Sequence, residues 1–301
     1  MRVTAMMEQQ QFLYNLENIN TSMQNVQEEL STGKTLNLPQ NDPVAVSQDM
    51  NLAAEVSEIN AGLSTVSSGL SWMNTTSTAL QGMISQLQEI QSNVVEALNS
   101  TSQSGGSLAG IEASVNQLIE GIYQIADQKI GDRYIFGGQA WNVAPSSYTQ
   151  QSGTQPIGAS SDVSYEITSG VSISVTVTAS SIFLTPPSGA KDLQTTLNDI
   201  ENDLQSGNMS ALSSDLNDLN QNLSNVINLN ADLGARIQRM TAAQNQMQQY
   251  QTNLSNLKGG IEGADMAQVI TQFSTDQVIY EAALQMGAQI LLPSLVNYLP
   301  N

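Results

Sequence analysis

The sequence predicts a mainly α-helical protein, a long antiparallel helical bundle or coiled coil with a small inserted β domain and paired terminal helices. Along most of the chain, apolar residues recur in alternating steps of three and four, the pattern of helices that bury one face. Residues 140–187 depart from this pattern, because apolar residues there alternate with small polar ones, as in strands.

The longest ladder of apolar residues lies in the second helix. Only Ser77 and Gln91 interrupt it with polar side chains, so a single rod with one narrow apolar stripe is predicted from Pro43 to about Leu98. Asp42 is the expected N-cap. The apolar members of the ladder are Val56, Ile59, Leu63, Val66, Leu70, Met73, Leu80, Ile84, Leu87, Val94 and Leu98. Such a stripe needs a partner helix.

Shorter ladders lie on both sides of this rod. Residues 12–30 predict an amino-terminal helix that ends in a loop at 31–39. After a turn at Ser102–Gly106, residues 108–125 can return along the rod as an antiparallel hairpin. The order of elements places the two ends of the chain side by side and antiparallel.

The carboxyl half repeats the same spacing. Residues 193–204 predict one helix, and after a break at Ser206–Asn208 residues 212–254 predict a second long one. Lys258–Gly263, with three glycines, is expected to be a hinge before a last striped helix over 270–298.

Between the helical halves the sequence favours extended structure. Aromatic and β-branched residues bounded by glycines predict an extended segment over 131–138. Alternation over 163–167 and 171–177, separated by Ser169–Gly170, predicts a β-hairpin. The expected domains are 1–42 plus 262–301, a terminal coiled-coil domain; 43–139 plus 188–261, a helical bundle; and 140–187, a small β-rich outer domain.

Composition excludes several classes of function. With 27 acidic and eight basic residues, the net charge of -19 argues against nucleic acid as a partner. The absence of Cys and His removes disulfides, thiolate nucleophiles and the usual zinc and copper sites. No cofactor or metal is expected. No run of about 18 apolar residues or Sec-type signal is found, so membrane insertion is not expected.

Three local patterns suggest chemistry, and each has a structural alternative that we favour. Ser31 and Lys34 have the S-x-x-K spacing of acyl-transferring enzymes but lack the other motifs of those enzymes. An acidic cluster, consisting of Asp199, Glu201 and Asp203, fits a solvated helix face better than a cation site. Asp232 and Arg236 read as an exposed i,i+4 pair.

Tyr134 and Phe136, next to two glycines, could hold a ligand, although a packed turn between modules is the more frequent use of such a segment. We place the domain connections at Asp42 and Pro43 and at Gly137 and Gly138.

The terminal helices carry the predicted subunit contacts. They lack a core of their own, so we expect their stripes to become fully ordered only in an assembly. The predicted contact residues are Phe12, Leu16, Ile19, Met23, Val26, Leu30, Ile270, Phe273, Tyr280, Leu284, Leu291, Leu295 and Tyr298.

Six segments carry a resemblance to a known family. They are Met1–Thr4, Leu30–Lys34 leading to Asp42–Pro43, Tyr134–Gly138, Leu233–Ile237, Tyr280–Leu284 and Ser294–Leu299. With them nearly the whole chain resembles the bacterial flagellin superfamily, and within it the hook-associated family of hook–filament junction proteins. Asn41 departs from the pattern at a position where that family has an acidic residue, and the β insertion is short.

The resemblance implies a terminal coiled-coil domain lining an axial channel, a helical second domain and an outer β domain. It also implies export by the flagellar type III apparatus, with a cytoplasmic chaperone holding the carboxyl end. The expected protein is a non-enzymatic structural adaptor of the extracellular flagellum. It polymerises as a ring with copies of itself, between the first hook-associated protein and flagellin.

Three alternatives remain open at this point. The chain could be a minor flagellin that forms filament, although the expected Ser-Gly-Lys/Arg-Ile-Asn-type loop is replaced by Thr32–Leu36. It could instead be an exported coiled-coil adhesin or effector that binds a partner through residues 141–187. A hydrolase using Ser31 is the third alternative.

Overall fold

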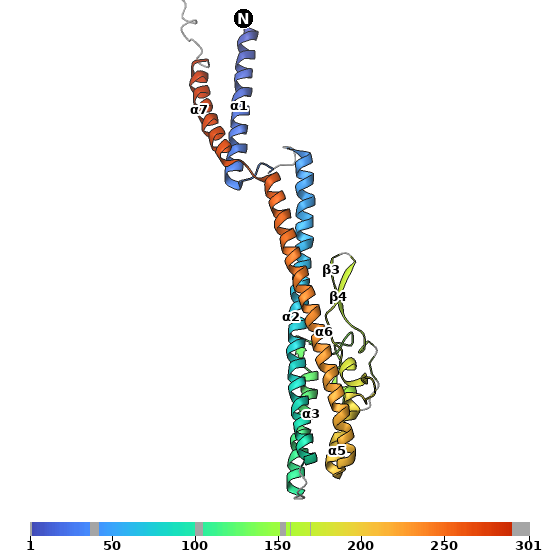
Figure 1. Ribbon diagram of the computed structural model, residues 1–301. Helices are drawn as coiled ribbons and strands as arrows, with labels where there is room; N and C mark the ends of the chain where they lie inside the picture. The colour runs from blue at the N-terminus through green and yellow to red at the C-terminus, as the bar shows by residue number, and fades with distance from the viewer. Residues whose placement is uncertain are drawn as a thin grey trace, which may run out of the picture. The chain divides into compact units, whose positions relative to one another are not determined.

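A computed structural model describes residues 2–36, 42–99, 105–150, 155–156, 158–168 and 170–290. It divides into two compact units, Met1–Glu58 with Tyr250–Asn301 and Ile59–Gln249. The fold is mainly α, as predicted (Figure 1). The division into three domains stays a prediction.

Two long antiparallel helices, α2 (Pro43–Asn99) and α6 (Met209–Glu262), contribute most of their length to the second unit, and residues 43–58 and 250–262 belong to the first. The two polar residues of the α2 ladder pair across this contact. Ser77 Oγ donates to Asn230 Oδ1 at 2.9 Å, and Gln91 Nε2 donates to Asn220 Oδ1 at 2.5 Å. Because the residue number rises on one helix as it falls on the other, these bonds also confirm the antiparallel direction.

A third helix, α3 (Gly105–Ala126), returns antiparallel along α2, as predicted (Figure 1). Asn93 Nδ2 donates to Ser114 Oγ at 3.1 Å, and a Cβ at Gly82 would lie 3.3 Å from Ile125 Cδ1. Further residues of α2 beside the predicted ladder are buried, including Ala79 and Met83. The apolar stripe is therefore wider than predicted, because α2 has two partner helices here.

Several boundaries differ from the prediction. Helix α3 already includes Gly105 and Gly106, whereas the rest of the predicted turn lies outside the described residues. Helix α5 (Leu193–Ser206) ends at Gly207 with φ +70°, and Asp192 caps its start by accepting from the Thr195 N–H at 2.8 Å. Helix α6 runs through Gly259 and Gly260. The hinge prediction is wrong for that glycine pair. The helix ends at Glu262, immediately before Gly263.

The insertion contains the predicted hairpin and two helices that the alternation did not reveal. Strand β3 (Ser164–Thr168) pairs antiparallel with β4 (Val171–Ser174). A short helix, α4 (Ser146–Thr149), and a π-helix, η1 (Ser180–Leu184), bury Tyr148 and Phe183. The segment 131–138 is extended only within a small hairpin of β1 (Lys129–Ile130) and β2 (Arg133–Tyr134). Beyond it a turn buries Phe136, which supports the packed-turn interpretation.

The insertion shares one hydrophobic core with the helices of its unit. The Tyr123 ring of α3 stacks on Phe183 with centroids 5.5 Å apart, and its hydroxyl donates to the Thr149 carbonyl at 3.3 Å. Burial raises the pKa of Tyr123 to about 12, so this hydroxyl remains a donor at neutral pH. A tyrosine on α3 thus holds both α4 and η1.

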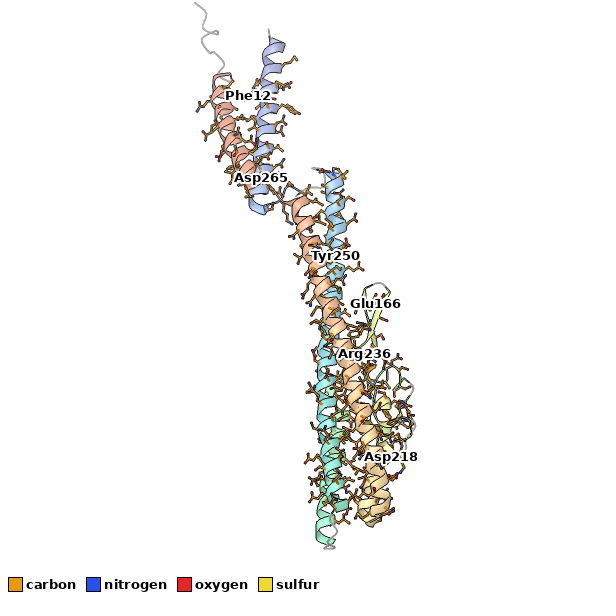
Figure 2. The ribbon with its side chains drawn as sticks, in the orientation of Figure 1. Phe12, Glu166, Asp218, Arg236, Tyr250 and Asp265 are labelled. Atoms are coloured by element: carbon orange, nitrogen blue, oxygen red, sulfur yellow. The ribbon has the colours of Figure 1, made fainter. Side chains whose placement is uncertain are left out.

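Arg236 of α6 holds the hairpin side of the insertion (Figure 2). Its Nη1 donates to Ser174 Oγ at 3.0 Å and to the Thr176 carbonyl at 3.4 Å, while Nη2 pairs with Asp232 at 2.6 Å. The sequence predicted only an exposed pair with Asp232. The arginine is partly buried because it joins α6 to the end of β4.

Replacing two glycines tests the boundary of α6. Around Gly260 there is no neighbouring atom within 4 Å of an added Cβ, so Gly260→Ala should stabilise the helix by about 0.5 to 1 kcal/mol. An added Cβ at Gly263 would lie 2.5 Å from the Gly259 carbonyl oxygen, so Gly263→Ala should destabilise the protein. Thermal unfolding followed by circular dichroism measures both. A loss of stability in Gly260→Ala would support a hinge instead.

Candidate assembly interface

The terminal helices α1 (Arg2–Thr32) and α7 (Met266–Ile290) pair with each other in the first unit (Figure 1). The Phe12 ring packs on Gly287, where an added Cβ would lie 2.6 Å from Phe12 Cζ. Further along, Ser22 Oγ donates to Asp276 Oδ2 at 2.9 Å. These two contacts run in opposite directions along the two helices, which confirms the predicted antiparallel pairing.

The face of α7 turned toward α1 has a strict heptad-like spacing. Its buried or half-buried residues are Val269, Phe273, Asp276, Tyr280, Ala283 and Gly287. One position in the middle of this face is polar: Asp276 is 5% exposed and accepts from Ser22 Oγ and Gln272 Nε2, each at 2.9 Å. Both donors are neutral side chains. The contact between α1 and α7 therefore includes a buried acidic residue at a position where the spacing would place an apolar one.

The structure separates the predicted contact residues into two groups. Phe12, Leu16, Ile19, Met23, Val26 and Leu30 on α1, and Phe273 and Tyr280 on α7, are buried or half-buried. By contrast, Ile270 and Leu284 are 53% and 48% exposed. Leu291, Leu295 and Tyr298 lie outside the described residues. Spacing alone predicted one stripe, yet Ile270 and Leu284 lie beside the face of α7 that α1 covers.

We call the exposed apolar residues of both helices the outer terminal face. Its members are Met7, Leu13, Tyr14, Met266, Ile270, Val278, Ile279, Leu284 and Met286, each at least 40% exposed. Only two of them were predicted. The sequence does contain a sign of the other seven: the terminal helices have more apolar residues outside the ladder than one partner helix can cover. Helix α7 carries two charged residues, Asp276 and Glu281, and only Glu281 is exposed.

At the base of the pair, α1 meets the α6–α7 connection through the backbone. Gly33 ends α1 with φ +70°, which only glycine adopts readily, and its carbonyl accepts from the Ala264 N–H at 3.0 Å. The Thr35 N–H donates to the Glu262 carbonyl at 2.8 Å. These bonds, with the bridge between Lys34 and Gly263, form a short two-stranded joint.

An ion network covers this joint. Glu262 Oε2 accepts from Lys34 Nζ and from Lys258 Nζ, each at 2.9 Å, and Lys258 also reaches Asp49 of α2 at 3.2 Å. Hydrogen bonds from Lys258 and then Lys34 lower the pKa of Glu262 below its ordinary value. Lys34, the lysine of the S-x-x-K pattern, is thus a structural partner of Glu262, which supports reading that segment as a helix-ending loop.

The predicted connecting residues have clear local roles. Asp42 Oδ1 accepts from the N–H groups of Val44 and Ala45 at 3.0 Å each, and Pro43 is the first residue of α2, so the predicted cap is confirmed. Gly138 is buried with φ +59°, and an added Cβ would lie 2.7 Å from the Ser161 carbonyl oxygen. Gly137 is also buried. That these four residues connect domains stays a prediction.

The acidic cluster on α5 contains more than a solvated face. Lys191 Nζ lies 2.5 Å from Asp199 Oδ2 and 3.0 Å from Asp215 Oδ1, and these bonds raise the pKa of Lys191. Burial, together with a hydrogen bond to Asp215, raises the pKa of Asp203, while Glu201 is exposed. One ammonium group is thus shared between Asp199 of the cluster and Asp215 of α6, while Glu201 remains a solvated side chain. The described residues include no group of three acidic side chains placed to hold a metal ion.

Among the helices in the described ranges, none combines the length and hydropathy needed to cross a bilayer.

Comparisons with known sequences identify both halves of the helical fold. The bacterial flagellin N-terminal helical region matches residues 3–140, and the bacterial flagellin C-terminal helical region matches residues 216–299. The comparison with curated proteins found no match.

Solved structures of hook-associated proteins share the fold. A putative flagellar hook-associated protein from Vibrio parahaemolyticus has 17% identity and a TM-score of 0.66, covering 74% of this chain and 100% of that one. FlgL from Bacillus cereus has 21% identity and a TM-score of 0.54, covering 72% and 99%. Flagellar hook-associated protein 3 from Legionella pneumophila has 13% identity and a TM-score of 0.60, covering 69% and 97%.

The network at the joint predicts a pH dependence. Because folding lowers the pKa of Glu262, its stabilising effect is fully present above the ordinary glutamate pKa of about 4.3 and is lost as the pH falls through the lowered value. Glu262→Gln should therefore lower stability by about 1 kcal/mol at pH 7 and by much less at pH 3.

Thermal unfolding at several pH values measures this difference. The same substitution at exposed Glu281 is the control and should change stability little at either pH. An equal effect of Glu262→Gln at pH 7 and pH 3 would contradict the assignment.

Proposed function

Because this chain belongs to the bacterial flagellin family, we propose that it is a structural adaptor of the bacterial flagellum that polymerises at the hook–filament junction. In this role it forms a short ring between the first hook-associated protein and flagellin. The likeness to solved hook-associated proteins supports the junction over the filament as its place. No reaction is part of this proposal.

The observation that carries the proposal is the outer terminal face. Pairing of α1 with α7 covers one side of each helix and leaves Ile270, Val278 and Leu284 among the exposed apolar residues. Several large exposed apolar residues on one pair of helices favour a protein–protein contact. We infer that copies of the chain, and its neighbours in the flagellum, cover this face.

The scarcity of charge on α7 favours contact between identical copies. With a net charge of -19, two copies repel each other over most of their surfaces. Glu281 is the one exposed charged residue of the described part of α7, so repulsion there is small. Burying apolar area contributes about 25 cal/mol per Å² to association, and little electrostatic repulsion opposes it there.

The remaining partners of the proposal concern delivery. We propose that a cytoplasmic export chaperone holds the carboxyl-terminal region, including the exposed residues of α7, until the chain leaves through the flagellar type III apparatus. A chaperone there would keep the outer terminal face from associating before export, because it would cover the same apolar residues.

Two substitutions separate assembly from folding. Leu284→Asp places a charge on the exposed face, so we expect normal unfolding but at least a tenfold loss of incorporation into flagella. Leu16→Asp changes a residue that packs against α7, so it should also loosen the terminal pair while leaving the second unit folded. Gln285→Glu, which adds a charge at an exposed neighbouring position without removing apolar area, is the matched control. Incorporation is measured by labelling isolated flagella. Normal incorporation of Leu284→Asp would refute the contact.

Deleting the gene tests the junction itself. We expect intact hooks, no attached filaments and filament material in the medium. A minor flagellin would instead leave attached filaments in the deletion strain, and the purified protein would grow long filaments on seeds. Normal swimming of a strain that lacks the protein would contradict the adaptor role.

A further inference from the structure

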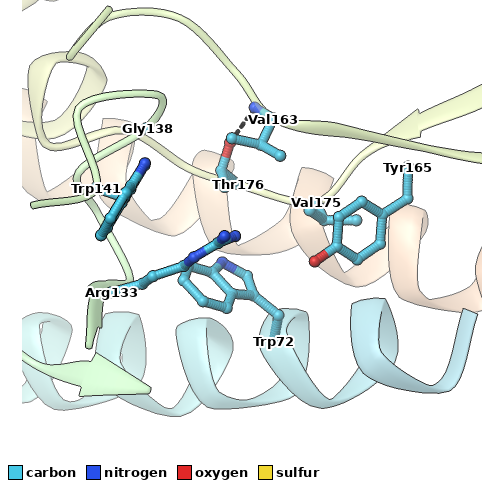
Figure 3. Close-up of a pocket in the computed structure, with 8 residues that line it drawn as sticks. All are labelled: Trp72, Arg133, Gly138, Trp141, Val163, Tyr165, Val175 and Thr176. Atoms are coloured by element: carbon cyan, nitrogen blue, oxygen red, sulfur yellow. Dashed lines mark hydrogen bonds between the residues drawn. The ribbon is translucent and has the colours of Figure 1, made fainter. Parts of the chain in front are cut away.

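A small pocket in the second unit combines donors that have no acceptor. It lies between α2, β2 and the insertion, with a cavity of about 30 Å³, room for one or two waters or a carboxylate group (Figure 3). Both tryptophans of the chain line it, together with Arg133 and Tyr165. We call these four residues the Trp–Arg pocket.

Arg133 is held by aromatic contact instead of by a carboxylate. Its guanidinium lies over the Trp141 ring, 5.2 Å from the centroid, a cation–π contact. Figure 3 shows the Arg133 side chain between the indoles of Trp141 and Trp72. Within the described ranges, Arg133 forms no ion pair, although the chain has 27 acidic residues. Arg133 is exposed to solvent and also lines the pocket, so its charge is available to a ligand there.

Trp72 adds a second donor to the same space. Its Nε1 is fully buried and has no hydrogen-bond partner in the part of the chain that the structure describes. In Figure 3 this nitrogen is on the edge of the indole nearest Arg133, and the Tyr165 hydroxyl also points toward the pocket. A buried donor without an acceptor costs about 1 to 3 kcal/mol. Arg133 is exposed and Tyr165 is half-buried, so water can satisfy their donors, and the buried Trp72 N–H is the donor that calls for an acceptor from this space.

The walls of the pocket are fixed by the backbone. Val163 N–H donates to Thr176 Oγ1 at 2.9 Å, and both residues line the pocket. Gly138 lies against the carbonyl oxygens of Gly158, Ala159 and Ser161, which leave no room for a side chain there. None of the lining residues is acidic. The lining of the site therefore contains one positive charge and no competing acidic side chain.

We propose that the Trp–Arg pocket binds a carboxylate group, which accepts from the Arg133 guanidinium and the Trp72 indole N–H. A carboxylate matches the fork of guanidinium donors and fits the volume, and it adds a charge-assisted hydrogen bond that a neutral acceptor does not offer. Two sources offer this chemistry. One is a small free carboxylate, and the other is an Asp or Glu side chain of a second copy of this chain.

Intrinsic fluorescence reports directly on the site, because both tryptophans of the chain line it. Sodium acetate is titrated into the full-length protein with sodium chloride replaced at constant ionic strength, and acetamide serves as the neutral analogue. We expect a saturable change in emission with acetate, with half-saturation at roughly millimolar concentration, and none with acetamide. A dilution series without acetate tests the second source, since a side chain from another copy would make the emission depend on protein concentration.

Matched variants assign the effect to the pocket. Arg133→Gln should weaken acetate binding at least tenfold, and Arg133→Lys should weaken it less because the charge remains. Lys129→Gln is the control: Lys129 lies in the same small hairpin and stacks on Tyr134 at 4.3 Å but does not line the pocket. Trp72→Phe removes the indole donor, leaves Trp141 as the reporter, and should also weaken binding.

The possible outcomes are distinct. Saturable binding lost with Arg133→Gln and kept with Lys129→Gln supports the site, as does a concentration-dependent emission that acetate abolishes. An equal response in wild type and Arg133→Gln, or no response to either acetate or protein concentration, overturns the proposal and leaves the pocket holding water only. Thermal unfolding of each variant checks that it is folded.

Discussion

The antiparallel contact between α2 and α6 fixes the geometry of the rest of the second unit. Its apolar stripe would allow several registers, since sliding by a heptad returns apolar residues to apolar positions. The bonds from Ser77 to Asn230 and from Gln91 to Asn220 select one register, because any slide leaves these half-buried polar groups without partners. Once α2 and α6 are aligned, α3 and the insertion pack against a defined surface.

The same logic applies on a smaller scale where the insertion joins the helices. The hairpin can lie close to the rod because Gly69 leaves room for the Tyr165 ring, and Arg236 then holds the end of β4. A two-stranded hairpin is marginally stable by itself in water. Its strands persist here because they share the core of the helices, with Ile167 and Ile173 buried in it.

Periodicity was sufficient to predict the long helices and their direction, because a helix that buries one face must repeat every three or four residues. The cap at Asp42 was predicted separately, from an N-cap side chain followed by Pro43. Periodicity could not predict η1 or α4, which are too short for a period to show and owe their form to burial of Phe183 and Tyr148. It also misplaced the hinge, since Gly259 and Gly260 remain helical beside the ion pairs of Lys258. For the candidate interface it found Ile270 and Leu284, but it did not separate them from the residues that α1 covers.

The scarcity of exposed charge on α7 has a consequence for how the first unit responds to its medium. The Debye length falls to about 8 Å at physiological ionic strength, so added salt weakens interactions between exposed charges and leaves apolar contacts intact. The joint around Glu262 is ionic and partly exposed, whereas the described part of α7 has one exposed charged residue, Glu281. Salt therefore acts on the two in opposite senses: it loosens the ties between α1 and the end of α6, and by screening the net charge of -19 it favours the approach of one outer terminal face to another.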